Sequence, residues 1–264
     1  MNNHDHGPAT AGNAATHPPL HAWLSVLCGA GCGLVLWVAL SSTLLPDTTA
    51  TVRRLIELQA RGLGLGALLA MAGLGVLLPR PPAAGAWWNR SVAALVVVAV
   101  GSAVLALHRL GPQPDPVWLA LLAAVTCVGA LTAIVGLALL ETGQPRLRLP
   151  LRLAQALLGG ATLLFALFAL RWPAGSGLAA GPVPSLALLV VAVAGLLLAM
   201  WHGQGGLRPW RHRRGRWLAL ALAAGLPLLL AGLLYLQPGW ARVLWPLIAL
   251  SVLAGTATER LQSR

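Results

Sequence analysis

The residues of this sequence that could take part in chemistry are few, and their positions limit what that chemistry can be. The chain carries 6 acidic residues, 18 arginines and 7 histidines among 264 residues. Ionisable side chains in the middle of a bilayer are costly and usually functional, but no apolar run here has Asp, Glu or Lys at its centre. The ionisable residues nearest to those runs stand at their ends, where a long side chain can reach water: Arg61, Glu141, Arg152 and His202. We therefore predict that the chain has no catalytic residues of its own.

Histidine and cysteine are the residues most suited to hold a metal or haem. The 3 cysteines lie inside apolar runs, and no second closely spaced pair completes a zinc or iron–sulfur site, so we predict no metal site. His21 and His202 could supply the two axial ligands of a b-type haem. Haem is the less favoured hypothesis, because such ligands normally lie within a span and these two stand at its rim. His108 with Arg109 could instead donate to a quinone carbonyl.

The composition indicates an integral membrane protein. Hydrophobic residues make up 58% of the chain and charged residues 9%, whereas soluble proteins have about 25% charged residues. So many apolar residues cannot be buried inside one soluble globule of this size, and a lipid bilayer is the expected surrounding. The net charge of +12 does not indicate nucleic-acid binding, because the arginines fall between apolar runs, where such residues set membrane topology.

Eight apolar runs are long enough to cross a bilayer as helices. We predict an all-α fold, an integral membrane bundle of eight transmembrane helices, with a flexible polar tail at 1–19 and a single membrane domain at 20–264. The predicted crossings are 23–45, 62–78, 91–107, 117–140, 153–170, 185–201, 217–236 and 243–257. Pro227 is expected to kink the seventh.

The distribution of arginines predicts how this bundle is oriented. With eight crossings both termini lie on one side, and 12 of the 18 arginines fall on that side. The positive-inside rule then places both termini in the cytoplasm. Every basic residue is Arg and the chain is rich in Ala, Leu and Gly, which is typical of a GC-rich bacterial genome. We therefore predict a multi-pass protein of the bacterial inner (cytoplasmic) membrane.

The first apolar run carries a pattern of small residues at its middle. Gly29 and Gly33 are four residues apart and share one helix face, and Gly31 lies between them. In lipid, small residues let neighbouring helix backbones approach closely. We predict that Gly29, Gly31 and Gly33 make this run a packing centre for other helices. A reading of the same glycines as a nucleotide-binding loop is disfavoured, because such a loop follows a strand at a wet surface.

Three stretches of the sequence together resemble one family. Residues 23–34 (WLSVLCGAGCGL), 66–91 (GALLAMAGLGVLLPRPPAAGAWWNRS) and 227–260, with Gly255, Thr256, Glu259 and Arg260, are similar to the membrane anchor subunits of dimethyl sulfoxide reductase and related molybdenum-dependent oxidoreductases. The resemblance implies an eight-helix anchor that holds an iron–sulfur ferredoxin-like subunit and a molybdopterin catalytic subunit at the membrane. It also implies binding of quinone or quinol, electron exchange with the ferredoxin-like subunit, and no haem.

The quinone site implied by this resemblance falls on the turn after the second apolar run. A quinone needs an apolar slot with a few polar donors near one interface. The sequence departs from the family here, since Leu77 stands where the family has a loop histidine and an apolar run follows Ser91 where an acidic residue is expected. The candidate quinone-binding residues are Arg80, Trp87, Trp88, Asn89 and Arg90.

A self-standing transporter or channel is the main alternative to an anchor subunit, and a b-type cytochrome is a third. A transporter would need broken helices or an internal repeat. Pro227 and Pro246 could break the last two runs, but the first half of the sequence has no matching pair.

Overall fold

The structure of the chain is a computed structural model. The structure describes residues 18–44, 50–79, 85–111, 115–141, 145–171, 182–203 and 213–262. Most of the predicted 1–19 tail lies outside these residues. Within the described ranges the secondary structure is helical throughout, apart from short turns, and no strand is present.

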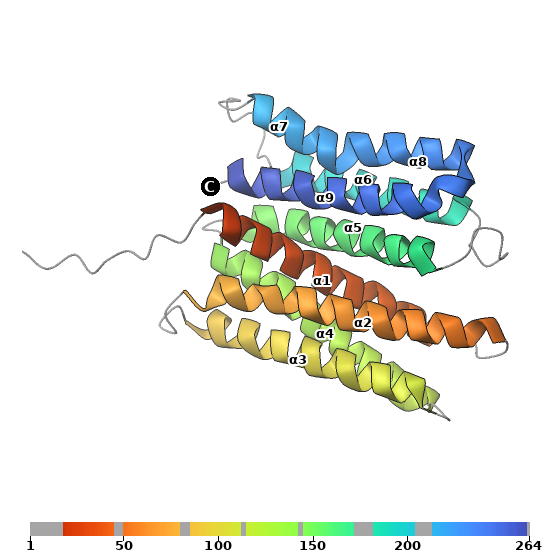
Figure 1. Cartoon of the computed structure of the whole chain (residues 1–264). Coiled ribbons are helices and arrows are strands. Elements are labelled where there is room, and N and C mark those ends of the chain that lie inside the picture. The colour runs from red at the N-terminus through yellow and green to blue at the C-terminus, as the bar shows by residue number, and fades with distance from the viewer. Residues whose placement is uncertain are drawn as a thin grey trace, which may run out of the picture.

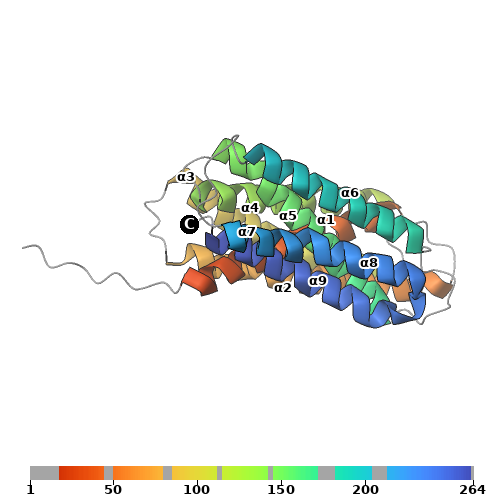
Figure 2. The same cartoon turned by 90° about the horizontal axis from the view of Figure 1, so that it is seen from above.

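The helices lie side by side along one common axis (Figures 1 and 2). Helix α1 begins at the same end of the bundle at which α9 finishes (Figure 1). We call this end, at which α2 also finishes and α3 begins, the terminal end. The helices are α1 (Pro18–Leu44), α2 (Ala50–Leu77), α3 (Ala86–Leu110), α4 (Pro116–Glu141), α5 (Pro145–Arg171), α6 (Pro182–Gly203), α7 (Arg213–Leu220), a π-helical segment η2 (Ala221–Gly225), α8 (Leu226–Leu236), a 3-10 turn η3 (Pro238–Trp240) and α9 (Ala241–Gln262).

Seven helical stretches of the described residues are long and apolar enough to cross a membrane. They correspond to seven of the eight predicted crossings, with α7, η2 and α8 together forming the stretch Trp217–Leu236. The remaining prediction, 185–201, corresponds to α6, whose described apolar part is the shorter stretch Leu186–Met200. Helix α2 starts twelve positions before the predicted run, because its first turns contain Arg and Glu, which favour a helix but not lipid.

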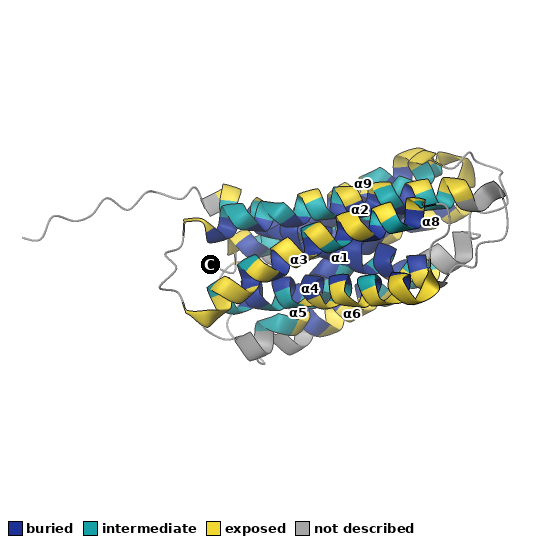
Figure 3. Ribbon diagram, turned by 90° about the horizontal axis from the view of Figure 1, so that it is seen from below, coloured by how far each residue is buried: buried dark blue, intermediate teal, exposed yellow. Residues whose placement is uncertain are grey.

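Helix α1 lies at the centre of the bundle. Its apolar window is 67% buried, whereas the window of α3 is 33% buried. Helix α1 packs against α2, α4, α5 and α9, and the buried residues gather along it while the outward helix faces stay exposed (Figure 3). Exposed leucine and valine on those outward faces suit contact with lipid chains.

Two opposite faces of α1 approach neighbouring backbones through small residues. Gly33 lies against the backbone of α5, so that an added methyl group would collide with the carbonyl of Ala156 and would lie 3.4 Å from the Cα atom of Gly160. Across the helix, a methyl group on Gly31 would lie 2.6 Å from the carbonyl oxygen of Gly66 in α2. These separations leave no room for a side chain, which is why the first apolar run requires glycine at these positions.

The stretch from α7 to α8 deviates from α-helical geometry just before Pro227. The backbone N–H of Leu226 donates to the carbonyl of Ala221, which is a π-helical step of five residues. The next step would need an N–H from Pro227 to the carbonyl of Leu222, but proline has none. The hydroxyl of Ser251 in α9 donates to that carbonyl instead, at 2.5 Å. The predicted proline kink is therefore a π-helical segment completed by a neighbouring helix.

This pairing makes the effect of Ser251 depend on Pro227. We expect Ser251→Ala to lower the free energy of unfolding by about 1–2 kcal/mol, because it leaves the partly buried Leu222 carbonyl without this hydrogen bond. In a Pro227→Ala background the same change should cost less, since residue 227 then has an N–H for the Leu222 carbonyl. Denaturant titration of the four proteins in detergent measures both costs, and equal costs in the two backgrounds would contradict this interpretation.

Candidate functional site

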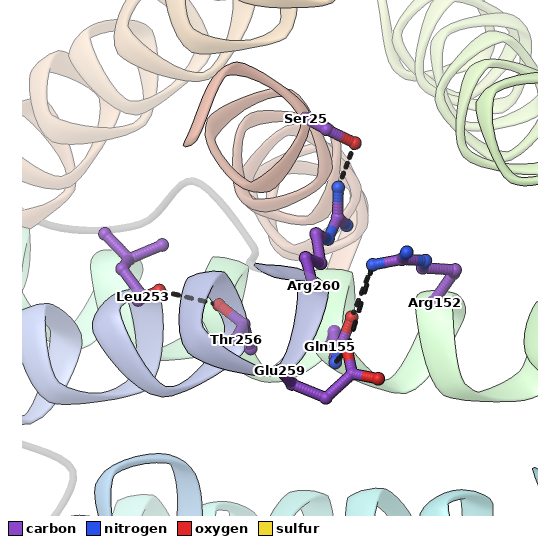
Figure 4. Close-up of polar contacts among 7 residues, drawn as sticks. All are labelled: Ser25, Arg152, Gln155, Leu253, Thr256, Glu259 and Arg260. Carbon is purple, nitrogen blue, oxygen red and sulfur yellow. Dashed lines mark hydrogen bonds and ion pairs between the residues drawn. The ribbon is translucent and has the colours of Figure 1, made fainter. Parts of the chain in front are cut away.

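The largest group of polar side chains inside the described bundle lies near the terminal end, at the junction of α1, α5 and α9. It consists of Ser25, Arg152, Gln155, Glu259 and Arg260 (Figure 4). We call these five residues the polar cluster. The surroundings are apolar, since Val26 and Ala30 of α1 pack there against Leu253 and Ala257 of α9.

Glu259 joins α9 to α5 through Gln155 and Arg152. The side-chain amide of Gln155 donates to the Glu259 carboxylate at 3.0 Å, and an Arg152 guanidinium nitrogen lies 4.0 Å from the same oxygen. Arg152 also donates to the amide oxygen of Gln155, at 3.4 Å. Arg152 and Gln155 are three residues apart, so that both face α9 from one side of α5. The Glu259 carboxylate is thus the only acidic group of the polar cluster, which also contains two arginines.

Arg260 joins α9 to α1. Its guanidinium donates to the hydroxyl of Ser25 (Figure 4), and only 6% of the arginine is exposed. Gly29 lies one turn after Ser25, where an added methyl group would be 3.5 Å from an Arg260 nitrogen and 3.8 Å from the methyl group of Ala156. The guanidinium therefore lies over a glycine, and a larger residue there would compete with it for space.

Two small cavities adjoin the polar cluster. One is lined by Ser25, Gly29, Arg152 and Arg260 together with residues of α4, and the other by Gly29, Gln155 and Arg260 with apolar neighbours. Each has a volume of about 10 Å³, close to the minimum that holds one water molecule. A quinone or a haem needs several hundred Å³. The polar cluster as it stands therefore holds helices together and has room for water, but not for a cofactor.

The residues predicted to bind quinone lie on the same end of the bundle, at the start of α3. Trp88 is partly buried and donates its indole N–H to the Leu77 carbonyl at 3.2 Å, which ties α3 to the end of α2. Trp87 and Arg90 point outward, with the guanidinium carbon 5.0 Å from the indole ring centre, and Asn89 is exposed. The structure brings these four together on one helical turn. Arg80 lies outside the described residues.

Other residues from the sequence analysis lie apart from the polar cluster. His108 is at the opposite end of the bundle, where its ring nitrogen lies 3.3 Å from the carbonyl oxygen of Asp115. Arg109 beside it is buried. The side chains of Glu141 and His202 are outside the described residues, which leaves the haem hypothesis without a described second ligand.

Arg152 is the residue that the sequence interpretation placed wrongly. It was expected to extend toward water from the end of a run, but it is 7% exposed and points into the bundle toward Glu259. The signal that could have identified it is the spacing Arg152-x-x-Gln155 before a charge-free run, together with an acidic residue at the end of the last run. Charged side chains inside a membrane bundle usually pair with each other.

Comparisons with known proteins returned no matching family model, no matching curated protein and no matching solved structure.

The ion pair of the polar cluster can be tested with a double-mutant cycle. We expect Glu259→Met or Arg152→Met alone to lower the free energy of unfolding by about 2–3 kcal/mol. That is somewhat below the ~3–5 kcal/mol for breaking a fully buried pair, because 19% of the Glu259 side chain remains exposed. The double variant should lose less than the sum, because neither charge is then left alone. Arg242→Met, an exposed arginine of α9, is the control; strictly additive losses would contradict the pairing.

Proposed function

We propose that this chain is a membrane anchor subunit of a respiratory oxidoreductase complex of the dimethyl sulfoxide reductase type. In this proposal it binds an iron–sulfur ferredoxin-like subunit and, through it, a molybdopterin catalytic subunit. It exchanges electrons with the ferredoxin-like subunit through a bound quinone or quinol. The chain itself supplies the membrane domain and the quinone-binding surface and performs no group-transfer chemistry.

The observation that carries this proposal is the meeting of the resembling stretches at one end of the bundle. Ser25 of the first stretch accepts a hydrogen bond from Arg260 of the third stretch, and Arg260 also lies close to Gly29 of the first. Glu259 of the third stretch belongs to the same polar cluster through Gln155 and Arg152. The described parts of the second stretch include the end of α2 and the start of α3, which lie at the same end (Figure 1). The resemblance therefore falls on residues that lie near one another, as expected when such residues share a role.

A second support is the position of the charged residues. In the described helices most of them lie toward the helix ends, and Arg61, farther inside α2, precedes the charge-free residues 62–77. A bundle of this kind suits an anchor with a site near one interface better than a carrier with a charged site at mid-depth. At the π-helical segment η2, the Leu222 carbonyl accepts a hydrogen bond from Ser251, so that this carbonyl is not left open to coordinate an ion.

The proposal includes an eighth crossing by α6. Its 22 residues correspond to about 33 Å of helix, against a hydrocarbon core of about 30 Å. Helix α6 packs along α5, and α7 begins at the terminal end where α6 finishes (Figure 1). With α6 counted, both termini lie on one side. The larger number of arginines there supports placing that side in the cytoplasm of a bacterium, with the bundle in the inner membrane.

The quinone in this proposal binds at the start of α3. The Arg90 guanidinium lies over one face of the Trp87 indole and leaves the other face for a ligand, at the level where tryptophan prefers to lie in a bilayer. A quinone ring can stack on the indole while its carbonyl accepts a hydrogen bond from the guanidinium. Trp88 holds the turn in place through its hydrogen bond to Leu77.

The proposal predicts that Trp87→Ala/Arg90→Ala separates electron transfer from assembly. The complex is purified from native membranes through a tag on this chain. It should contain molybdenum and iron–sulfur clusters both with the unchanged chain and with the double variant. Reduction or oxidation of those clusters by a quinol or quinone should slow by about tenfold, equivalent to ~1.4 kcal/mol of binding. Trp118→Ala, which removes another exposed tryptophan at the opposite end of the bundle, is the control.

Three results would contradict the proposal in different ways. A purified chain without molybdenum and iron–sulfur partners contradicts the anchor role. Solute flux through proteoliposomes that contain this chain alone favours the transporter, and a Soret band in the purified protein favours the cytochrome. Unchanged quinone-linked electron transfer in the variant contradicts only the location of the quinone site.

A further inference from the structure

We propose that the end of the bundle opposite the terminal end carries a binding site for one anionic phospholipid, with the lipid phosphate held by arginines of α2 and α5. The site is a cavity of about 200 Å³ lined by Arg54, Glu57, Leu58, Arg61 and Arg171. This cavity is larger than a phosphate group and smaller than the ~300–1,000 Å³ pockets of drug-sized ligands. The inference does not depend on the proposed anchor function.

The charges of the cavity select an anion. Three guanidinium groups and one carboxylate line it, which leaves it positive overall. Arg54 and Arg61 are seven residues apart and so share one face of α2, and Arg171 reaches the cavity from the last residue of α5. Arginine presents several N–H donors in a fixed plane that matches phosphate oxygens. All three arginines are exposed, and each is therefore available to a ligand.

The depth of the cavity matches the headgroup level of a bilayer. Arg61 is the last charged residue before the charge-free run 62–78 of α2, and Arg171 directly follows the charge-free run 153–170 of α5. Both helices therefore pass from lipid-compatible to charged residues at the cavity. Basic side chains at this level attract anionic headgroups. A purely aqueous anion would not need a site at this boundary.

The surface below the cavity fits an acyl chain. Along α2, the positions that follow Arg61 on the same face are Gly64 and Leu68. A methyl group added at Gly64 would meet no atom within 4 Å, and Leu68 is 69% exposed. Leu170, next to Arg171, is 56% exposed. A shallow apolar strip without a side chain at Gly64 thus continues from the basic cavity, which favours a phospholipid over free phosphate.

The test measures lipid binding to the full-length protein in neutral detergent by native mass spectrometry. Phosphatidylglycerol should bind in preference to phosphatidylcholine. The double variant Arg61→Gln/Arg171→Gln should weaken the binding of phosphatidylglycerol by about 25-fold, because each arginine is expected to contribute a factor of about five. Arg53→Gln, an adjacent exposed arginine that does not line the cavity, is the matched control. Glu57→Gln should strengthen binding, a change that misfolding cannot mimic.

Further measurements distinguish binding of a phospholipid from binding of a soluble anion. Gly64→Leu should weaken binding of phosphatidylglycerol and leave the affinity for glycerol phosphate unchanged. The proposal is overturned if phosphatidylcholine binds as tightly, or if Arg53→Gln weakens binding as much as the double variant. It is also overturned if inorganic phosphate alone displaces the lipid at matched concentrations and Gly64→Leu has no effect.

Discussion

The close approach of α1 to α2 and α5 is the constraint on which the rest of the bundle depends. In lipid there is little hydrophobic gain from bringing helices together, so van der Waals contact between backbones must supply much of the attraction. Gly33 opposes Ala156 and Gly160 on α5, and Gly31 opposes Gly66 on α2. Two opposite faces of α1 are thereby covered by neighbouring helices. This explains why α1 is the most buried of the seven long apolar stretches.

Helix α1 also packs where two hydrophobic cores meet, against α5, which contributes to both cores, and against α9. One core is formed largely by α1 to α4 and the other by α5 to α9. They meet where α1, α5 and α9 come together, and there the polar cluster adds directional bonds to the apolar contact. The backbone contacts bring α1, α5 and α9 close together. The polar cluster fixes how far each helix is shifted along its neighbours, because a shifted helix would leave buried charges unpaired.

Much of the fold followed from the sequence, because hydrophobic length and glycine spacing are local signals. Seven helical stretches of the described residues that are long and apolar enough to cross a membrane fall where the apolar runs predict them. The partner of each glycine could not be predicted, since the pattern on α1 does not say that Ala156 and Gly160 lie opposite. Arg152 was misplaced for a similar reason: whether an arginine at a run's end turns outward or inward depends on a carboxylate 107 positions away in the chain. The basic cavity of α2 and α5 likewise joins residues that are distant in sequence.

The most direct test of this account compares Gly33→Ala with Gly64→Ala by denaturant unfolding in detergent without added lipid. Both changes add one methyl group to a glycine within a membrane helix, but only the first meets a neighbouring backbone. The account predicts a loss of about 1–3 kcal/mol for Gly33→Ala and a change within about 0.5 kcal/mol for Gly64→Ala. Equal stabilities of the two variants would contradict a bundle built on the contacts of α1.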